Sequence, residues 1–131
     1  MRLCIIADDL TGALDAAAPF AERGLSTRVA LGAEATAEAA ALNPQVMAVS
    51  TRSRDGDEAA ARAAMAQVLA ALPPGVALMK KVDSRLKGHV AAELAVLDPS
   101  AMLVAPAIPD FGRITRDGQV LYLAPPTPAG G

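Results

Sequence analysis

The stretch IIADDLTGA, from Ile5 to Ala13, decides the fold because it runs from an apolar segment directly into two acids and then into a helix-like sequence. Leu3 to Ala7 has the length and apolar composition of a buried β-strand. Helical composition extends from Gly12 to Arg23 and ends at Gly24, a residue type that commonly terminates helices. A buried strand followed by a helix is the first half of a βαβ unit, so we expect a parallel sheet.

The same alternation of strand and helix continues along the chain. Four further apolar runs of strand length are Thr27–Leu31, Val46–Ser50, Val76–Met79 and Met102–Ala105. Stretches of helical composition between them are Glu34–Leu42, Asp57–Leu72 and His89–Leu97. This order predicts an α/β fold, a doubly wound and mainly parallel sheet with helices on both faces.

The sequence changes character after Ala105. Pro106, Pro109 and Gly112 predict an irregular loop, and Arg113 to Leu123 reads as a C-terminal β-hairpin around Asp117-Gly118. We therefore expect one α/β domain over residues 1–124. Residues 125–131 are rich in Pro and Gly and are expected to be a linker or a truncated end.

Composition excludes several classes of partner. The net charge is −2, from 12 basic and 14 acidic residues, and no long run of either sign resembles the basic stripe of a nucleic-acid-binding protein. The apolar run that ends before Asp8 is too short for a signal peptide or a membrane span. The single cysteine, Cys4, lies in the first predicted strand and is interpreted as a buried structural thiol. We expect a cytoplasmic protein without nucleic-acid or membrane partners.

Polar residues gather where the predicted strands end. Those that follow the first, third and fourth strands include Asp8, Asp9, Thr11, Arg52, Lys81 and Asp83. Ligands of open parallel sheets bind beyond these carboxyl ends, so the cluster predicts a polar ligand site. Adjacent residues of an extended segment point to opposite sides; one acid is therefore expected to face the ligand and the other to cap the helix near Gly12. Taken singly, each charge could instead be a helix cap or a solvated loop residue.

Several familiar enzyme motifs are missing from the sequence. It has no G-x-x-x-x-G-K-[ST] phosphate loop, no G-x-G-x-x-G after the first strand and no G-x-S-x-G nucleophile motif. His89 has no second His or Cys placed to form a metal site with it. A haloacid-dehalogenase-like phosphatase would need an aspartate at Leu10, and a receiver domain would need one where Ser50 and Thr51 stand.

Four separated motifs, in order along the whole chain, resemble the four-carbon acid sugar kinase family. They are ADDLTGALDAA (Ala7–Ala17), STRS (Ser50–Ser53), KKVDSRLKG (Lys80–Gly88) and PAIPDFGRITRDG (Pro106–Gly118). The resemblance implies a two-domain enzyme whose N-terminal domain binds threonate, erythronate or 3-oxo-tetronate and whose C-terminal domain binds ATP. The implied reaction is ATP-dependent phosphorylation of the sugar acid's terminal hydroxyl, with Mg²⁺ accompanying the nucleotide.

By this resemblance the chain is the sugar-acid-binding part of the enzyme, without the nucleotide-binding C-terminal domain. We expect it to be inactive alone, and the alternative is a sugar-acid-binding module with no catalytic role. The alanine-rich helices would also allow a homodimer.

The resemblance also implies roles for individual residues. Expected catalytic residues are Asp8, Asp9, Lys81 and Asp83, and expected substrate-binding residues are Thr11, Gly12, Arg52, Ser84, Arg85, Lys87, Gly112 and Arg113. A carboxylate such as Asp8 can accept hydrogen bonds from sugar hydroxyls, and Arg52 or Arg113 can bind the sugar's carboxylate. The third motif commonly reads D-S-T-L-R-G, whereas Lys87 stands here in place of its arginine and offers only a point charge.

Overall fold

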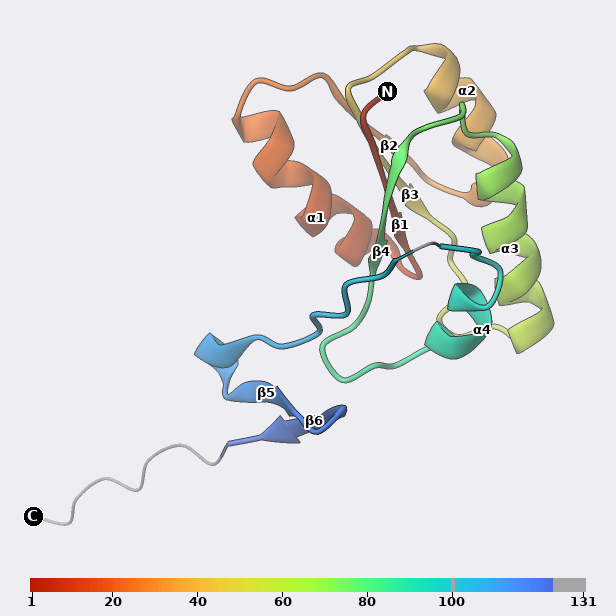
Figure 1. Ribbon diagram of the computed structural model, residues 1–131. Coiled ribbons are helices and arrows are strands. Elements are labelled where there is room, and N and C mark those ends of the chain that lie inside the picture. Colours follow the sequence, from red (N-terminus) through yellow and green to blue (C-terminus); the bar gives the residue numbers. More distant parts are fainter. Residues whose placement is uncertain (100, 124–131) are drawn as a thin grey trace, which may run out of the picture.

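A four-stranded parallel sheet forms the centre of the computed structural model, which describes residues 1–99 and 101–123 (Figure 1). Its strands are β1 (Leu3–Ala7), β2 (Thr27–Ala30), β3 (Val46–Ser50) and β4 (Ala77–Lys81), in the order β2-β3-β1-β4. The predicted linker over residues 125–131 lies outside the described residues.

Helices cover both faces of this sheet, which confirms the predicted α/β architecture (Figure 1). Helix α1 (Leu10–Glu22) packs on one face. The other face carries η1 (Ala33–Ala35), α2 (Thr36–Ala41), α3 (Glu58–Ala70) and α4 (Val90–Leu94). Helix α3 begins after Asp57, whose carboxylate accepts a hydrogen bond from the Ala60 N–H at 2.7 Å.

Strand alternation divides the core into two hydrophobic layers. Cys4 and Ile6 of β1 point toward α3, where they belong to the same buried cluster as Met65. Ile5 and Ala7 point toward α1, whose facing residues are small alanines that allow the helix to lie close to the sheet. Cys4 is fully buried, and this burial raises its pKa to about 12, as expected of a structural thiol.

The predicted fifth strand, Met102–Ala105, is wrong: among the described residues this segment forms no ladder with β4 or with any other strand. Leu103 and Val104 are 92% and 69% exposed. A short apolar run records a preference for burial, but strand formation also needs a partner edge at hydrogen-bonding distance. The segment instead runs beside β4 without backbone pairing, and β4 remains at the edge of the described sheet.

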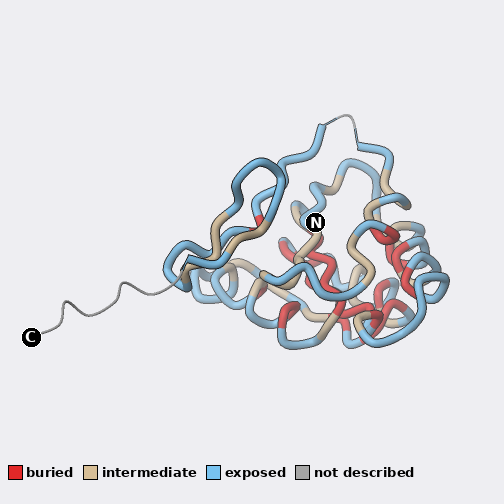
Figure 2. The backbone as a smooth tube through the Cα atoms, turned by 90° about the horizontal axis from the view of Figure 1, so that it is seen from below, coloured by how far each residue is buried: buried red, intermediate tan, exposed pale blue. Residues whose placement is uncertain are grey.

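The C-terminal hairpin is confirmed, with β5 (Arg113–Arg116) paired antiparallel to β6 (Gln119–Tyr122). A short 3₁₀ helix, η2 (Pro109–Phe111), precedes it. Figure 2 shows that buried residues concentrate in the sheet and its helices, while the hairpin is exposed or half-buried. No helix within the described part of the chain is both long and apolar enough to cross a membrane.

Met65 tests the packing of α3 on the sheet, because its side chain is 1% exposed within the core. We expect Met65→Ala to lower the free energy of unfolding by about 2 to 5 kcal/mol, from lost burial and the cavity left behind. Urea denaturation followed by circular dichroism measures this. Leu42→Ala, at a position 62% exposed, should change stability by less than about 0.5 kcal/mol. Equal losses in both variants would contradict this core.

Candidate functional site

The register of the sheet brings three chain segments to one edge. Ala7, at the end of β1, pairs with Ser50 of β3 on one side and with Lys81 of β4 on the other. The next residues along each strand therefore leave the sheet side by side. The Thr51 N–H donates to the Ala7 carbonyl at 2.8 Å, which continues the contact past the end of β3.

Arg54 joins the two acids at the centre of this edge. Its Nε and one terminal nitrogen donate to the two oxygens of Asp8 at 3.0 and 2.8 Å, and its other terminal nitrogen donates to Asp9 at 2.6 Å. Such a two-pronged contact is the strongest geometry for an arginine and a carboxylate. Hydrogen bonding to Asp8 raises the pKa of Arg54, so the guanidinium is charged at any physiological pH.

The two acids share Arg54 but differ in burial and in their other contacts. Asp8 is 3% exposed. Asp9 precedes α1 in an extended conformation, and its Oδ1 accepts a hydrogen bond from the Gly12 N–H at 2.9 Å while Oδ2 contacts Arg54. One acid is therefore buried against the arginine, and the other also caps the helix.

The sequence predicts Arg52 in the polar cluster at the strand ends, whereas Arg54 is the arginine that hydrogen-bonds both acids. The backbone turns at Arg52, which adopts a left-handed conformation with φ of 54°. Its side chain pairs with Glu34 in an exposed contact, although it also lines the small pocket beside Asp8. The segment Ser-Thr-Arg-Ser-Arg offers two arginines, and no signal in the sequence reveals the turn that selects the second one.

The end of β4 and the loop after it bring Lys81 and Asp83 to the same edge. Lys81 donates from Nζ to the Val82 carbonyl at 2.8 Å, and its side chain lies beside Gly12 at the start of α1. Burial alone would raise the pKa of Asp83. Hydrogen bonds from the backbone N–H groups of Arg85 and Lys87, together with the charges of Arg54 and Lys87, outweigh burial and lower it.

Gly88 allows this loop to approach Asp8 closely. A Cβ at position 88 would lie 2.6 Å from Asp8 Oδ2, which is closer than real contacts permit. Gly88 also has a φ of +85°, a conformation that residues with a side chain adopt reluctantly. Glycine is therefore favoured at position 88 for two reasons: the backbone is left-handed there, and the loop lies close to the buried carboxylate of Asp8.

Arg113 ties the hairpin to the loop after β4. It hydrogen-bonds the Ser84 hydroxyl, and its guanidinium lies 5.9 and 5.8 Å from the ring centroids of Phe111 and Tyr122. Gly112 adopts a left-handed conformation with φ of 66° at the end of η2, immediately before this arginine. The structure thus brings together three predicted residues, Ser84, Gly112 and Arg113. They make their contacts between the hairpin and the loop after β4.

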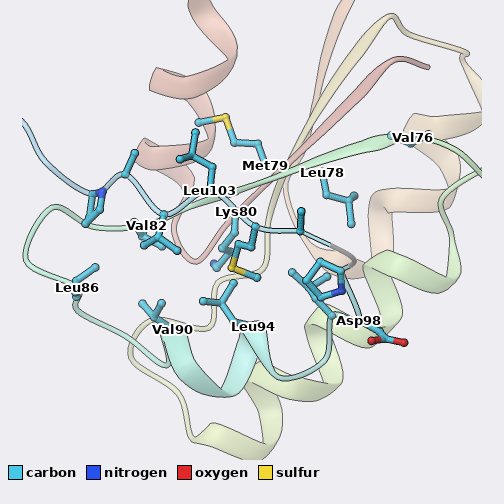
Figure 3. Close-up of a pocket in the computed structure, with 17 residues that line it drawn as sticks. Val76, Leu78, Met79, Lys80, Val82, Leu86, Val90, Leu94, Asp98 and Leu103 are labelled. Atoms are coloured by element: carbon cyan, nitrogen blue, oxygen red, sulfur yellow. The ribbon is translucent and has the colours of Figure 1, made fainter. Parts of the chain in front are cut away.

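A small charged pocket and a larger apolar groove lie in this region, and the charged pocket is the better match for a polar ligand. A pocket of about 210 Å³ is lined mainly by charged residues, among them Asp8, Asp9, Arg52 and Arg54. A groove of about 830 Å³ runs between β4, α4 and residues 101–106 (Figure 3). Its walls are mostly aliphatic, and Figure 3 shows Val82, Leu86 and Val90 among the side chains that line it. A sugar acid carries an oxygen on every carbon, so the charged pocket fits it better.

Comparison with known proteins identifies the family. The family model described as a sugar-binding N-terminal domain matches residues 3–129. The chain belongs to this family. This assignment agrees with the resemblance to four-carbon acid sugar kinases.

Three curated relatives are called D-threonate kinase. The protein from Bordetella bronchiseptica is 40% identical over 128 residues, which cover 91% of this chain and 31% of the relative. The protein from Cupriavidus necator is 44% identical over 125 residues, covering 90% and 29%. The protein from Salmonella typhimurium is 32% identical over 133 residues, covering 92% and 30%. The chain thus spans about 30% of the length of the relatives it matches.

Within this sugar-binding domain, some predicted site residues lie apart from the acid pair. Thr11, Arg85 and Lys87 are exposed, and the side chains of these three donate no hydrogen bond to Asp8 or Asp9 within residues 1–99 and 101–123. Gly12 is buried and contributes its backbone N–H to Asp9. Groups of three or more metal-binding side chains do not occur in the described part of the domain.

Gly88 and Gly75 form a matched pair that tests the close approach to Asp8. Both have left-handed backbones, but a Cβ at Gly75 would meet no atom within 4 Å. We expect Gly75→Ala to cost about 1 to 2 kcal/mol from backbone strain alone. Gly88→Ala should cost at least about 1 kcal/mol more, because the added methyl group displaces Asp8. Urea denaturation measures both variants, and equal losses would contradict the crowded contact.

The lowered pKa of Asp83 predicts a dependence of stability on pH. The ordinary value is 3.8, and in the folded state the pKa lies below it, so the unfolded chain takes up the proton first as pH falls. The stabilisation is therefore present above pH 3.8 and is lost as pH falls through the folded value. Asp83→Asn should reduce the free energy of unfolding at neutral pH and have little effect in strong acid. A loss that stays constant down to strong acid would contradict this linkage.

Proposed function

We propose that this domain is the substrate-binding portion of an ATP-dependent kinase that phosphorylates the terminal hydroxyl of a four-carbon acid sugar. The observation that carries the proposal is the acid pair, buried Asp8 and half-buried Asp9, held by Arg54 at the carboxyl end of the central strand. The family assignment and the names of the relatives support a sugar acid as ligand and D-threonate as the first candidate.

Charge decides which part of the sugar acid contacts the acid pair. Two carboxylates and one guanidinium sum to −1, so this cluster does not attract the ligand's own carboxylate. It suits hydroxyl groups, which donate to carboxylate oxygens. Asp9 is the more accessible of the two acids, with its side chain 29% exposed, and it can orient a hydroxyl for attack.

The ligand's carboxylate would then lie toward the basic residues at the end of β4 and in the loop after it. Lys81 uses one of its three N–H donors on the Val82 carbonyl and retains two. Arg85 and Lys87 are exposed on the same loop and add positive charge. Arg52 is also available, because an exposed pair such as the one it forms with Glu34 contributes little free energy.

ATP and Mg²⁺ belong to the proposed reaction, and we assign neither of them to the described residues. Both oxygens of Asp8 accept hydrogen bonds from Arg54, and no cluster of metal-binding side chains surrounds it within residues 1–99 and 101–123. We place the nucleotide in the part of the relatives that this chain does not match. The residues of this domain would bind the sugar acid and align its hydroxyl. Alignment of the reacting groups is a large part of how proteins catalyse phosphoryl transfer.

The alternative is a module that binds a sugar acid and takes no part in catalysis. An assay of ATP consumption with D-threonate separates the two functions. The chain alone should produce no ADP, and a polypeptide that continues into the nucleotide-binding region should produce it. ADP formation by the chain alone would contradict the division of labour proposed here. If the longer polypeptide binds the sugar acid but forms no ADP, the non-catalytic binding module is favoured.

Arg54 and Arg62 form a matched pair that tests the binding site. Both pair with acids, but the partner of Arg62 is Glu58, one turn earlier on the exposed surface of α3. Calorimetric titration of this chain with D-threonate should give a Kd at least tenfold weaker for Arg54→Lys, because lysine cannot hold Asp8 and Asp9 together with a planar fork. Arg62→Lys should leave the Kd unchanged. Equal affinities in the parent and both variants would place the sugar site elsewhere.

A further inference from the structure

A buried glutamate on α4 connects the sheet to the loop that carries Arg54. Glu93 is fully buried. Its Oε2 pairs with Lys80 Nζ at 2.9 Å, and its Oε1 accepts a hydrogen bond from the Ser53 hydroxyl at 2.8 Å. Figure 3 shows Lys80 on β4 among the side chains that extend from the strand toward α4. None of these three residues is explained by the proposed contacts with the ligand.

This arrangement is costly, which indicates a purpose beyond stability. Lys80 and Glu93 are 6% and 1% exposed in their side chains, and neither Nζ nor Oε2 makes a further hydrogen bond among the described residues. A buried ion pair often gives no more stability than apolar residues of similar volume. Helix α4 has only 5 residues, too few to be stable alone, so tertiary contacts of this kind must fix its position.

The hydrogen bonds continue from Glu93 toward Arg54. The Ser53 hydroxyl, whose hydrogen goes to Glu93, lies 2.8 Å from the Thr51 hydroxyl and can accept from it. The single hydrogen of Thr51 is donated either to Ser53 or to the Ala7 carbonyl at 3.0 Å, which the Thr51 N–H also contacts. Ser53 and Thr51 thus hold both sides of the left-handed turn at Arg52. The residue after Ser53 is Arg54, whose N–H donates to the Asp8 carbonyl at 3.3 Å. A shift of Ser53 would therefore move the base of the Arg54 side chain.

We propose that Glu93 is a positioning residue for the sugar-acid site. By accepting the hydrogen bond from Ser53, it holds the turn at Arg52 so that Arg54 meets Asp8 with two parallel hydrogen bonds. Lys80 offsets the charge that this acceptor brings into the core. The consequence for sugar binding rests on the proposed function, whereas the consequence for Arg54 geometry stands without it.

Two double variants separate the acceptor from the buried charge. Lys80→Met with Glu93→Leu removes both charges and the acceptor, and apolar replacement of a buried pair should preserve folding. Lys80→Met with Glu93→Gln also removes both charges but keeps an amide oxygen that can accept from Ser53. Urea denaturation verifies that both variants fold. Ser53→Ala tests the same contact from the other side and leaves the Lys80–Glu93 pair in place.

The readout is the Nε–H signal of Arg54 in ¹⁵N NMR, assigned by its loss in Arg54→Lys. In the parent this hydrogen donates to Asp8 and should exchange slowly with water. We expect exchange at least tenfold faster in the Glu93→Leu double variant and in Ser53→Ala, and slow exchange in the Glu93→Gln double variant. Retained protection in the Glu93→Leu variant would overturn the inference. Equal loss in both double variants would also overturn it, because charge rather than the acceptor would then be responsible.

Calorimetry with D-threonate on the same proteins supplies the second measurement. The Kd should rise at least tenfold wherever the Arg54 signal loses protection, and should stay near that of the parent in the Glu93→Gln double variant. If the parent binds no sugar acid, the proposed function fails, yet the NMR comparison still decides the role of Glu93. If the parent binds D-threonate and the Kd does not change in the variants whose Arg54 signal loses protection, the link from Glu93 to binding is wrong.

Discussion

Strand β1 is hydrogen-bonded on both sides, to β3 and to β4, and both ladders end at Ala7. This shared end is the constraint on which the site depends. Because parallel strands in register terminate together, Asp8 leaves the sheet with Thr51 on one side and Val82 on the other. A register shifted by one residue would exchange the two faces of the sheet and move Asp8 away from its neighbours. The apolar packing that fixes the register therefore also places the acids.

Burial of the Asp8 carboxylate determines much of what surrounds it. An ionised carboxylate with 3% exposure needs a partner of opposite charge, and Arg54 supplies one with two hydrogen bonds. Close approach of the next loop then requires a glycine at position 88. The same face of the sheet carries Lys80, whose charge is matched by Glu93. This part of the protein thus contains two ion pairs. Arg54 and Asp8 form the pair at the charged pocket, and Lys80 and Glu93 form the pair between β4 and α4.

The edge strand β4 separates two kinds of surface. Its carboxyl end contributes Lys81 to the charged pocket, while its exposed side contributes Leu78 and Met79 to the apolar groove. Alternation also divides its two lysines: Lys80 shares a face with Ile6, and Lys81 shares the opposite face with Ala7 and α1. Adjacent lysines in the sequence therefore have unrelated surroundings, one buried beside Glu93 and one at the strand ends.

The sequence by itself determined the α/β architecture, the hairpin and the capping of the first helix by one of the two acids, because these follow from local periodicity, turn chemistry and helix-capping chemistry. Only the tertiary structure decided that Arg54 rather than Arg52 meets the acids, since a left-handed turn between them has no signature in the residue types. It also decided that Met102–Ala105 stays unpaired and that Glu93 is buried. Each of these depends on contacts between residues far apart in the chain, which local patterns do not encode.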